Sequence, residues 1–401
     1  MNVRETAKRM PQTRNADGDP AHPPVLAWFN PDAEGETLAA MNGEARNPNA
    51  RVTAMEEDLE ILAMSWCGPG DIALLRHPPG PEHLSRLRRA GWDLPEIAGL
   101  PEIGGLAHRP LGGFRPWAWS PESSELLRPL AGAAAPASPH PWREALPAGW
   151  FSKELGLLLE SLLGATPGGI LCKNRESALA ALHDGLARGP VLLKAPIACA
   201  GRGHRRIDPP SPTSADLAWL DSALALHGGV VAEPWLDPVA DFSAQYDAAP
   251  GGAVRLLGIT VMRNDATGRF RAIRFAREWE ALLPPDAARF LAAETSARTL
   301  FSERIPPLLA KLLPGYTGPV GIDAMVHRQA DGSLALRPVV EVNVRTTMGR
   351  VAIELSRRLG APDPARLQIL RKSDWNKPRS PSALLPLNDP ATARQFVAVW
   401  G

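Results

Sequence analysis

The stretch from Val339 to Gly349 constrains this chain more than any other part of its sequence. In an extended strand, alternate side chains point to opposite faces, so Glu341, Asn343 and Arg345 are expected on one face and the intervening valines on the other. A carboxylate and an amide oxygen suit a hard divalent cation, and a guanidinium binds phosphate or carboxylate. The stretch therefore predicts a phosphate-handling surface, although an ordinary edge strand with solvated polar residues fits the same pattern.

A second strand brings another carboxylate to this surface. Residues Gly321 to Val326 alternate as a strand, and a turn near residues 331–332 returns the chain through Leu334 to Val344. An antiparallel hairpin of this kind would place Asp323 near the two polar residues of the partner strand. Three oxygen ligands on one face favour a metal site formed by Asp323, Glu341 and Asn343.

Two earlier strands end in charged residues. Val191 to Lys194 is an apolar run that ends in a lysine, and a loop containing Gly201-Arg202-Gly203 follows it. Val230 to Glu233 is a similar run that ends before a proline. The glycine loop alone is more often a turn than a phosphate loop, because neither a complete Gly-x-Gly-x-x-Gly nor a P-loop pattern is present.

Composition narrows the class of protein. A chain of 401 residues favours two or three packed domains, and 44 Lys and Arg nearly balance 43 Asp and Glu. This balance gives no indication of a nucleic-acid partner or a membrane surface. Three cysteines without Cys-x-x-Cys spacing argue against a disulfide framework or a zinc site. No apolar run is long enough to span a bilayer, so we expect a cytoplasmic protein.

Local patterns predict the remaining elements. Short apolar runs between turns and a helix predict a small α/β unit early in the chain, and Ser120 is the expected N-cap of a later helix. The expected strands are residues 25–29, 59–62, 71–75, 254–262, 270–275 and 396–400, and the expected helices are residues 81–90, 121–130, 152–163, 175–186, 280–313 with interruptions, and 353–359 closed by Gly360.

Four pieces of the sequence follow one another: the strand that ends in Lys194 with its glycine loop, the strand that ends in Glu233, the strand that carries Asp323, and the strand that carries Glu341 and Asn343. This ordered set resembles the ATP-grasp superfamily, in which two α+β subdomains clamp ATP between them. The resemblance covers roughly residues 152–360, and the preceding α/β unit resembles the pre-ATP-grasp domain of carboxylate-amine ligases. The expected division is a flexible arm (1–24), a pre-ATP-grasp-like α/β domain (25–130), an Ala/Pro-rich linker (131–148), a small lid subdomain (149–235), a large subdomain with the metal site (236–371) and a C-terminal extension (372–401).

The resemblance also implies roles for individual residues. Lys153 and Lys194 would contact ATP phosphates, and Asp323, Glu341 and Asn343 match the magnesium ligands of the family. The other implied nucleotide contacts are the lid residues Gly201, Arg202 and Gly203, the hinge glutamate Glu233 with Leu236 beside the adenine, and Asp241 at the ribose, where the family usually has Glu.

Arg345 follows the metal ligands, and many ATP-grasp ligases have a basic group near the acyl phosphate. We therefore expect Arg345 to contact a substrate carboxylate or the γ-phosphate, so that Arg345 and Lys194 form the catalytic pair.

The activity implied by the resemblance is ATP-dependent ligation with Mg²⁺. A small-molecule carboxylate would attack the γ-phosphate, and an amine would capture the acyl phosphate to give an amide or peptide, ADP and phosphate. An ATP-grasp kinase that phosphorylates a hydroxyl and a non-catalytic nucleotide-binding protein are the alternatives. The sequence names neither substrate, which could include amino acids or a peptide, and it leaves a homo-oligomer open.

Overall fold

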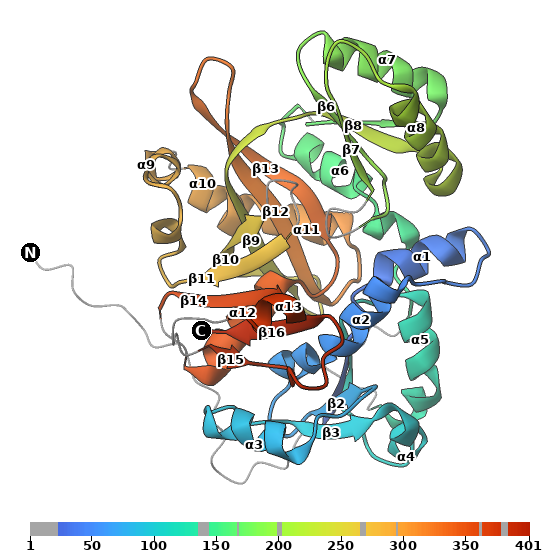
Figure 1. The fold of residues 1–401 in the computed structure, drawn as a ribbon, viewed down its shortest axis with the longest axis vertical. Coiled ribbons are helices and arrows are strands. Elements are labelled where there is room, and N and C mark those ends of the chain that lie inside the picture. Colours follow the sequence, from blue (N-terminus) through green and yellow to red (C-terminus); the bar gives the residue numbers. More distant parts are fainter. Residues whose placement is uncertain are drawn as a thin grey trace, which may run out of the picture.

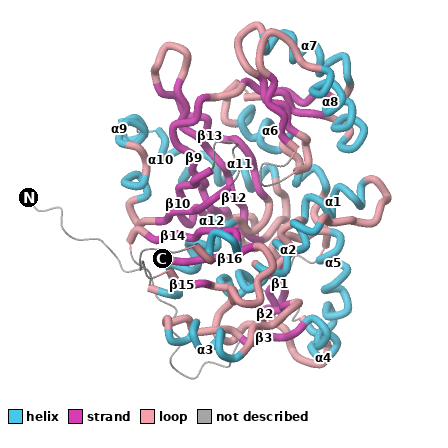
Figure 2. Tube along the Cα trace, in the orientation of Figure 1, coloured by secondary structure: helices cyan, strands magenta, loops and turns pink. Residues whose placement is uncertain are grey.

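The computed structural model describes residues 23–134, 144–166, 168–198, 203–264, 270–293, 296–360, 363–377 and 384–401. Most of the expected arm and linker, as well as Gly201 and Arg202 of the expected lid, lie outside these ranges. In the described part of the chain the strands form three sheets, each carried by a different region of the sequence (Figures 1 and 2).

The first sheet forms the small α/β unit that the sequence predicts. Its strands are parallel in the order β3-β2-β1-β4, and β1 and β2 are buried along their whole length. Continuous apolar runs suit such strands because both faces of a parallel sheet are covered. The strands are β1 (Val25–Trp28), β2 (Ile72–Leu75), β3 (Glu96–Gly99) and β4 (Gly113–Pro116).

Helices surround this sheet, and one of them corrects a prediction. Residues 59–62, expected as a strand, form instead the N-cap and the first three residues of a 3-10 helix whose seven residues are all buried. A short, fully buried apolar run has no periodicity that separates helix from strand. Ser120 caps α5 as expected. The helices are α1 (Ala33–Met41), α2 (Ala50–Asp58), η1 (Glu60–Trp66), α3 (Pro81–Arg89), η2 (Leu100–Glu102), α4 (Ile103–Leu106), α5 (Pro121–Leu127) and η3 (Arg128–Ala133).

The second sheet is antiparallel, in the order β5-β8-β6-β7, and has its own apolar core with α7 and α8. Figure 1 shows this unit in green, set apart from the large sheet. The chain enters it through η4 (Ala148–Phe151) and α6 (Glu154–Leu162), and α6 packs against β13. The other elements are β5 (Ile170–Cys172), α7 (Arg175–Leu186), β6 (Val191–Lys194), β7 (His204–Ile207), α8 (Ser214–His227) and β8 (Val230–Pro234).

The third sheet is antiparallel, in the order β13-β12-β9-β10-β11-β14-β16-β15. The expected hairpin and C-terminal strand are present. Two strands were not predicted from the sequence: β14 and the central strand β9, in which polar residues alternate with Phe242, Ala244 and Tyr246. The strands are β9 (Asp237–Ala248), β10 (Val254–Asn264), β11 (Phe270–Phe275), β12 (Gly318–Arg328), β13 (Leu334–Asn343), β14 (Ala365–Arg371), β15 (Leu385–Pro386) and β16 (Phe396–Trp400).

Helices cover both faces of the large sheet. Tyr246 donates a hydrogen bond to the carbonyl of Phe301 on η6, whereas Gly349 of α12 packs against Gln245, which points to the other face of β9. Helix α12 ends at Gly360 as expected but begins five residues before the expected start, where Thr347 caps it. These helices are η5 (Trp279–Leu282), α9 (Pro285–Ala293), α10 (Ser296–Thr299), η6 (Leu300–Arg304), α11 (Ile305–Leu312), α12 (Met348–Leu359) and α13 (Lys372–Trp375).

Polar contacts fasten the α/β unit to the large sheet. The Asp58 carboxylate accepts hydrogen bonds from the backbone N–H groups of Arg394, Gln395 and Phe396, at 2.7 to 2.8 Å. The backbone N–H of Thr346, just after β13, donates to the carbonyl of Trp117 at 2.8 Å. Both contacts join distant parts of the chain. The second contact places the α/β unit next to the end of β13. None of the helices in the described ranges is long and apolar enough to cross a membrane.

Candidate functional site

The candidate site begins with the hairpin of β12 and β13. Asp323 pairs in register with Glu341, and Gly321 pairs with Asn343, so the two carboxylates and the amide lie together as the sequence predicts. Asn343 Nδ2 donates to Asp323 Oδ2 at 3.3 Å, which leaves the amide oxygen available as a ligand.

A chain of buried hydrogen bonds holds Asp323 from the side of β9. Ser243 Oγ donates to Asp323 Oδ1 at 2.7 Å, and Gln245 Nε2 donates to Ser243 Oγ at 2.7 Å. Thr347, the N-cap of α12, donates to Gln245 Oε1 at 2.6 Å. These neighbours fix the orientation of the Asp323 carboxylate before any ligand is present.

The two carboxylates differ in their electrostatic surroundings. Burial and the facing Glu341 raise the pKa of Asp323 to about 6, against the opposing effect of the Ser243 hydrogen bond. Burial also acts to raise the pKa of Glu341, but nearby cations, above all Lys153, outweigh it and lower that pKa. A bound cation would therefore stabilise the charged form of Asp323, whereas Lys153 already compensates the charge of Glu341.

Lys153 lies at the N-terminal end of α6 and points at the metal-ligand set. Its Nζ is 3.0 Å from Glu341 Oε1 and donates to the carbonyl of Ala198 at 2.7 Å. The side chain is 5% exposed, so both contacts form away from bulk water. A lysine held against a carboxylate here can exchange that partner for an incoming anion.

Lys194 belongs to a second chain of buried charges. Lys194 forms an ion pair with Glu233, whose other oxygen is 2.7 Å from Arg337 Nη2. Arg337 Nε lies 3.4 Å from Glu160 Oε1 on α6. Burial acts to raise the pKa of Glu233, but Lys194 and Arg337 lower it. In this arrangement Glu233 is tied to two cations across the small and large sheets.

His204 joins this site from β7, where it pairs in register with Lys194. The loss of water around the ring and the charges of Lys194 and Lys153 lower the pKa of His204 to about 4. The ring is therefore neutral near pH 7 and can accept or donate one hydrogen bond beside the lysines.

Arg345 lies beyond the last residue of β13, so it does not continue the strand face as expected. Its Nε is 2.6 Å from Glu34 Oε1 on α1, and its guanidinium lies 6.0 Å from the ring centre of Trp117. Arg345 still acts on the metal-ligand set, because its charge helps to lower the pKa of Asp323 against the larger effect of burial.

Asp241, Leu236 and Gly203 are the remaining predicted contacts that the structure describes. Asp241 is on β9, two residues before Ser243, and accepts a hydrogen bond from Asn264 Nδ2 at 3.0 Å. Leu236 is half-buried in the short connection between β8 and β9. Gly203 has a φ of +69°, and its carbonyl accepts from the Ala195 N–H at 2.8 Å. Gly201 and Arg202 lie outside the described residues.

Three residues that support the site were not predicted from the sequence: Ser243, Gln245 and Arg337. Strict alternation of polar and apolar residues through β9 would have revealed the first two. A lone arginine inside the apolar run of β13 was the available signal for Arg337.

The donor set fits a hard cation through oxygen atoms. In the parts of the chain that the structure describes, no group of three or more His, Cys, Asp and Glu side chains could hold a metal ion. The cluster here has two carboxylates and one amide oxygen, which is the kind of partial shell that Mg²⁺ completes with water and phosphate oxygens. Among the described residues, no set of thiolate and imidazole ligands for a soft metal lies at this position.

The fold defines the structural class. No family model and no curated protein matches the sequence. The arrangement of a small antiparallel sheet, a large antiparallel sheet and a preceding α/β unit is the ATP-grasp fold, which confirms the predicted fold class.

Two solved structures carry this assignment. The biotin carboxylase domain of 2-oxoglutarate carboxylase from Hydrogenobacter thermophilus is 13% identical, with 94% of this chain and 85% of that chain covered and a TM-score of 0.51. Biotin carboxylase from Campylobacter jejuni is also 13% identical, with 94% and 87% covered and a TM-score of 0.50.

Proposed function

We propose that this protein is an ATP-dependent ligase that joins a small-molecule carboxylate to an amine and uses Mg²⁺. The observation that carries the proposal is the meeting of Asp323, Glu341 and Asn343 with Lys153, which reaches the set from a different subdomain. The two structures named above, which contain MgADP with bicarbonate and a β-γ-ATP complex respectively, support the same nucleotide chemistry.

We assign the residues as follows. Asp323, Glu341 and Asn343 hold Mg²⁺, which when bound neutralises charge on the phosphate oxygens. Lys153 and Lys194 bind the phosphates; Glu233 and Leu236 flank the adenine; and Asp241 contacts the ribose. Gly201, Arg202 and Gly203 form the lid, and the domain division is the one given by the sequence.

The chain contributes positioning and charge to the reaction. Lys194 and Lys153 stabilise negative charge on the γ-phosphoryl group as the substrate carboxylate attacks it and ADP leaves, and Arg345 orients that carboxylate. The acyl phosphate then reacts with the amine, which loses a proton as the C–N bond forms and phosphate leaves. Closure around the substrates excludes water, which would otherwise hydrolyse the acyl phosphate. The reaction needs no covalent nucleophile from the protein.

The test is an ADP-release screen against pooled carboxylic acids and amino acids, with mass detection of the coupled product. Asp323→Asn is expected to lower ADP release by about 100-fold or more, because it weakens charge stabilisation at the phosphates. Asp331→Asn is the matched control, since it makes the same change in the exposed turn of the same hairpin and should keep full activity. A phosphorylated hydroxyl compound without an amide product would identify a kinase instead, and unchanged activity of Asp323→Asn would refute the assignment.

A further inference from the structure

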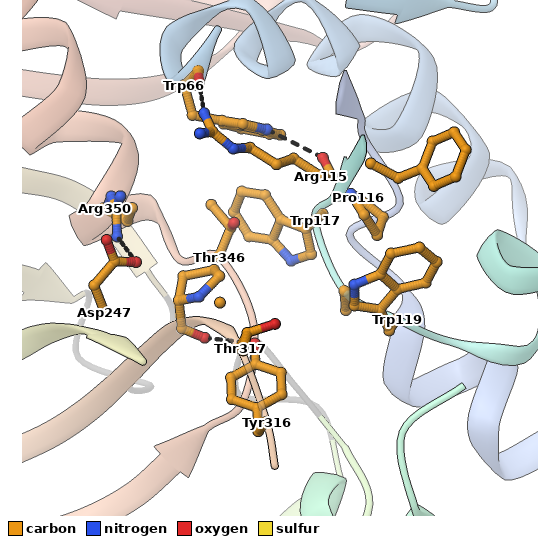
Figure 3. Close-up of a pocket in the computed structure, with 14 residues that line it drawn as sticks. Trp66, Arg115, Pro116, Trp117, Trp119, Asp247, Tyr316, Thr317, Thr346 and Arg350 are labelled. Carbon is orange, nitrogen blue, oxygen red and sulfur yellow. Dashed lines mark hydrogen bonds and ion pairs between the residues drawn. The ribbon is translucent and has the colours of Figure 1, made fainter. Parts of the chain in front are cut away.

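A cavity of about 80 Å³ lies between the α/β unit and the large sheet. Residues from Trp66 and the segment 114–119 line one side, and Tyr316, Thr317 and Arg350 are among those that line the other (Figure 3). Thr346, which immediately follows Arg345, is also part of the lining. The cavity therefore adjoins the residue that we assign to the substrate carboxylate.

Two buried polar atoms in this lining lack a hydrogen-bond partner among the described residues: Trp117 Nε1 and Thr317 Oγ1. Trp117 is 3% exposed and Thr317 is 9% exposed, so bulk water satisfies neither atom well. A buried donor without a partner costs about 1 to 3 kcal/mol. Figure 3 shows both side chains around the same space, to which they come from the two different units.

Trp117 cannot turn away to find a partner. Its backbone N–H donates to the carbonyl of Trp28 at 2.7 Å, and its carbonyl accepts from Thr346 at 2.8 Å. Its ring packs edge-on against Phe29, with the ring centres 5.2 Å apart, and lies 6.0 Å from the ring centre of Trp66. In Figure 3 the indole nitrogen of Trp117 lies on the edge of the ring that faces Thr317.

Size and charge restrict the occupant. The cavity is smaller than the cavity of about 150 Å³ that binds benzene, so it suits a group of fewer than six non-hydrogen atoms. The charged side chains around it already have partners: Arg350 pairs with Asp247 at 3.1 Å, and Arg115 donates to the carbonyl of Trp66 at 2.9 Å. An anion would have to displace one of these contacts and give up its own hydration, whereas an uncharged group avoids that cost.

The hydrogen-bonding groups of the lining restrict the occupant of the cavity further. An indole N–H only donates, and a hydroxyl either donates or accepts. We propose that this cavity binds a small uncharged carbonyl group of the substrate, such as an amide, whose oxygen accepts from Trp117 Nε1 and whose second polar contact is Thr317 Oγ1. Calling the occupant part of the substrate rests on the proposed function; the binding itself does not.

The test follows the indole N–H signals of the full-length protein labelled with ¹⁵N at its 12 tryptophans. Trp117→Phe identifies the Trp117 signal, and N-methylacetamide is the probe. We expect saturable movement of that signal, with affinity about fivefold to tenfold weaker in Thr317→Val, which loses one hydrogen bond. Acetate, which is charged and of similar size, should leave the signal in place.

Three outcomes would overturn the proposal: no movement up to the solubility limit of the probe, which would mean a cavity that holds water only; equal movement with acetate; or equal affinity in Thr317→Val. Unchanged positions of the indole signals from tryptophans outside the cavity lining show that both variants are folded. Calorimetric titration with MgATP is run on the same samples. Failure of nucleotide binding would refute the proposed function, but the cavity result would still stand.

Discussion

Arg337 is the residue whose loss should reveal most about how the large sheet is joined to the small sheet and to α6. It lies on β13 of the large sheet, 7% exposed, and its guanidinium pairs with Glu233 on β8 and with Glu160 on α6. Removing one partner from a buried ion pair leaves an uncompensated charge and costs about 3 to 5 kcal/mol. Glu233 keeps Lys194, so the larger share of the loss in Arg337→Met should fall on Glu160.

The stability lost in Arg337→Met should depend on pH, because Glu160 is the carboxyl group that loses its cationic partner. Burial raises the pKa of Glu160 even in the presence of Arg337, which opposes the shift. In Arg337→Met the folded-state pKa rises further. A raised folded-state pKa gives stability that is present at low pH and is lost as the pH rises through that value. The variant should therefore lose more stability near pH 8 than near pH 5, by about 1.4 kcal/mol for each further pKa unit.

Urea unfolding at the two pH values measures this effect. Arg328→Met is the matched control, since it removes an exposed arginine from the same hairpin, whose pair with Asp286 should contribute less than about 1 kcal/mol. Adding Glu160→Gln to Arg337→Met should recover part of the loss and remove its pH dependence. A loss below about 1 kcal/mol, or one that is equal at both pH values, would refute the view that Arg337 compensates a buried carboxylate.

Three further substitutions test separate features. Burial raises the pKa of Glu36 to about 7, so wild-type stability should fall as the pH rises through this value; Glu36→Gln should flatten that fall in urea unfolding, and an unchanged profile would contradict the cause. In Gly203→Ala the new methyl would approach two alanine methyls at 2.9 and 3.0 Å, whereas in Gly43→Ala a similar positive φ is combined with open space. Thermal unfolding should therefore show a larger loss of stability in Gly203→Ala. Equal losses in the two variants would exclude a steric contribution. Thr347→Val removes the α12 cap and the bond to Gln245, and should cost about 1 to 3 kcal/mol in urea unfolding; a change within experimental error would contradict this role.

Patterns with a clear period or a capping residue were readable from the sequence. The helix over Arg175–Leu186 and the strand over Val191–Lys194 have the predicted bounds, and the hairpin brings Asp323 beside Glu341 as expected. Each depends on local spacing, which a chain carries in any context. The strand predicted for residues 59–62 was wrong because this segment is buried on all sides, and its apolar residues therefore show no period that separates a helix from a strand.

The sequence alone indicated the ATP-grasp type of fold through its resemblance to that superfamily, and alternation along two strands placed Asp323, Glu341 and Asn343 on one face of the hairpin. Only the tertiary structure decided which distant residues contact Arg345, Lys194 and Trp117. It paired Arg345 with Glu34 from a distant helix, linked Lys194 through Glu233 to Arg337, and placed Trp117 against the end of β13. These contacts join residues separated by up to 311 positions in the chain, and their geometry exists only after the three units pack together.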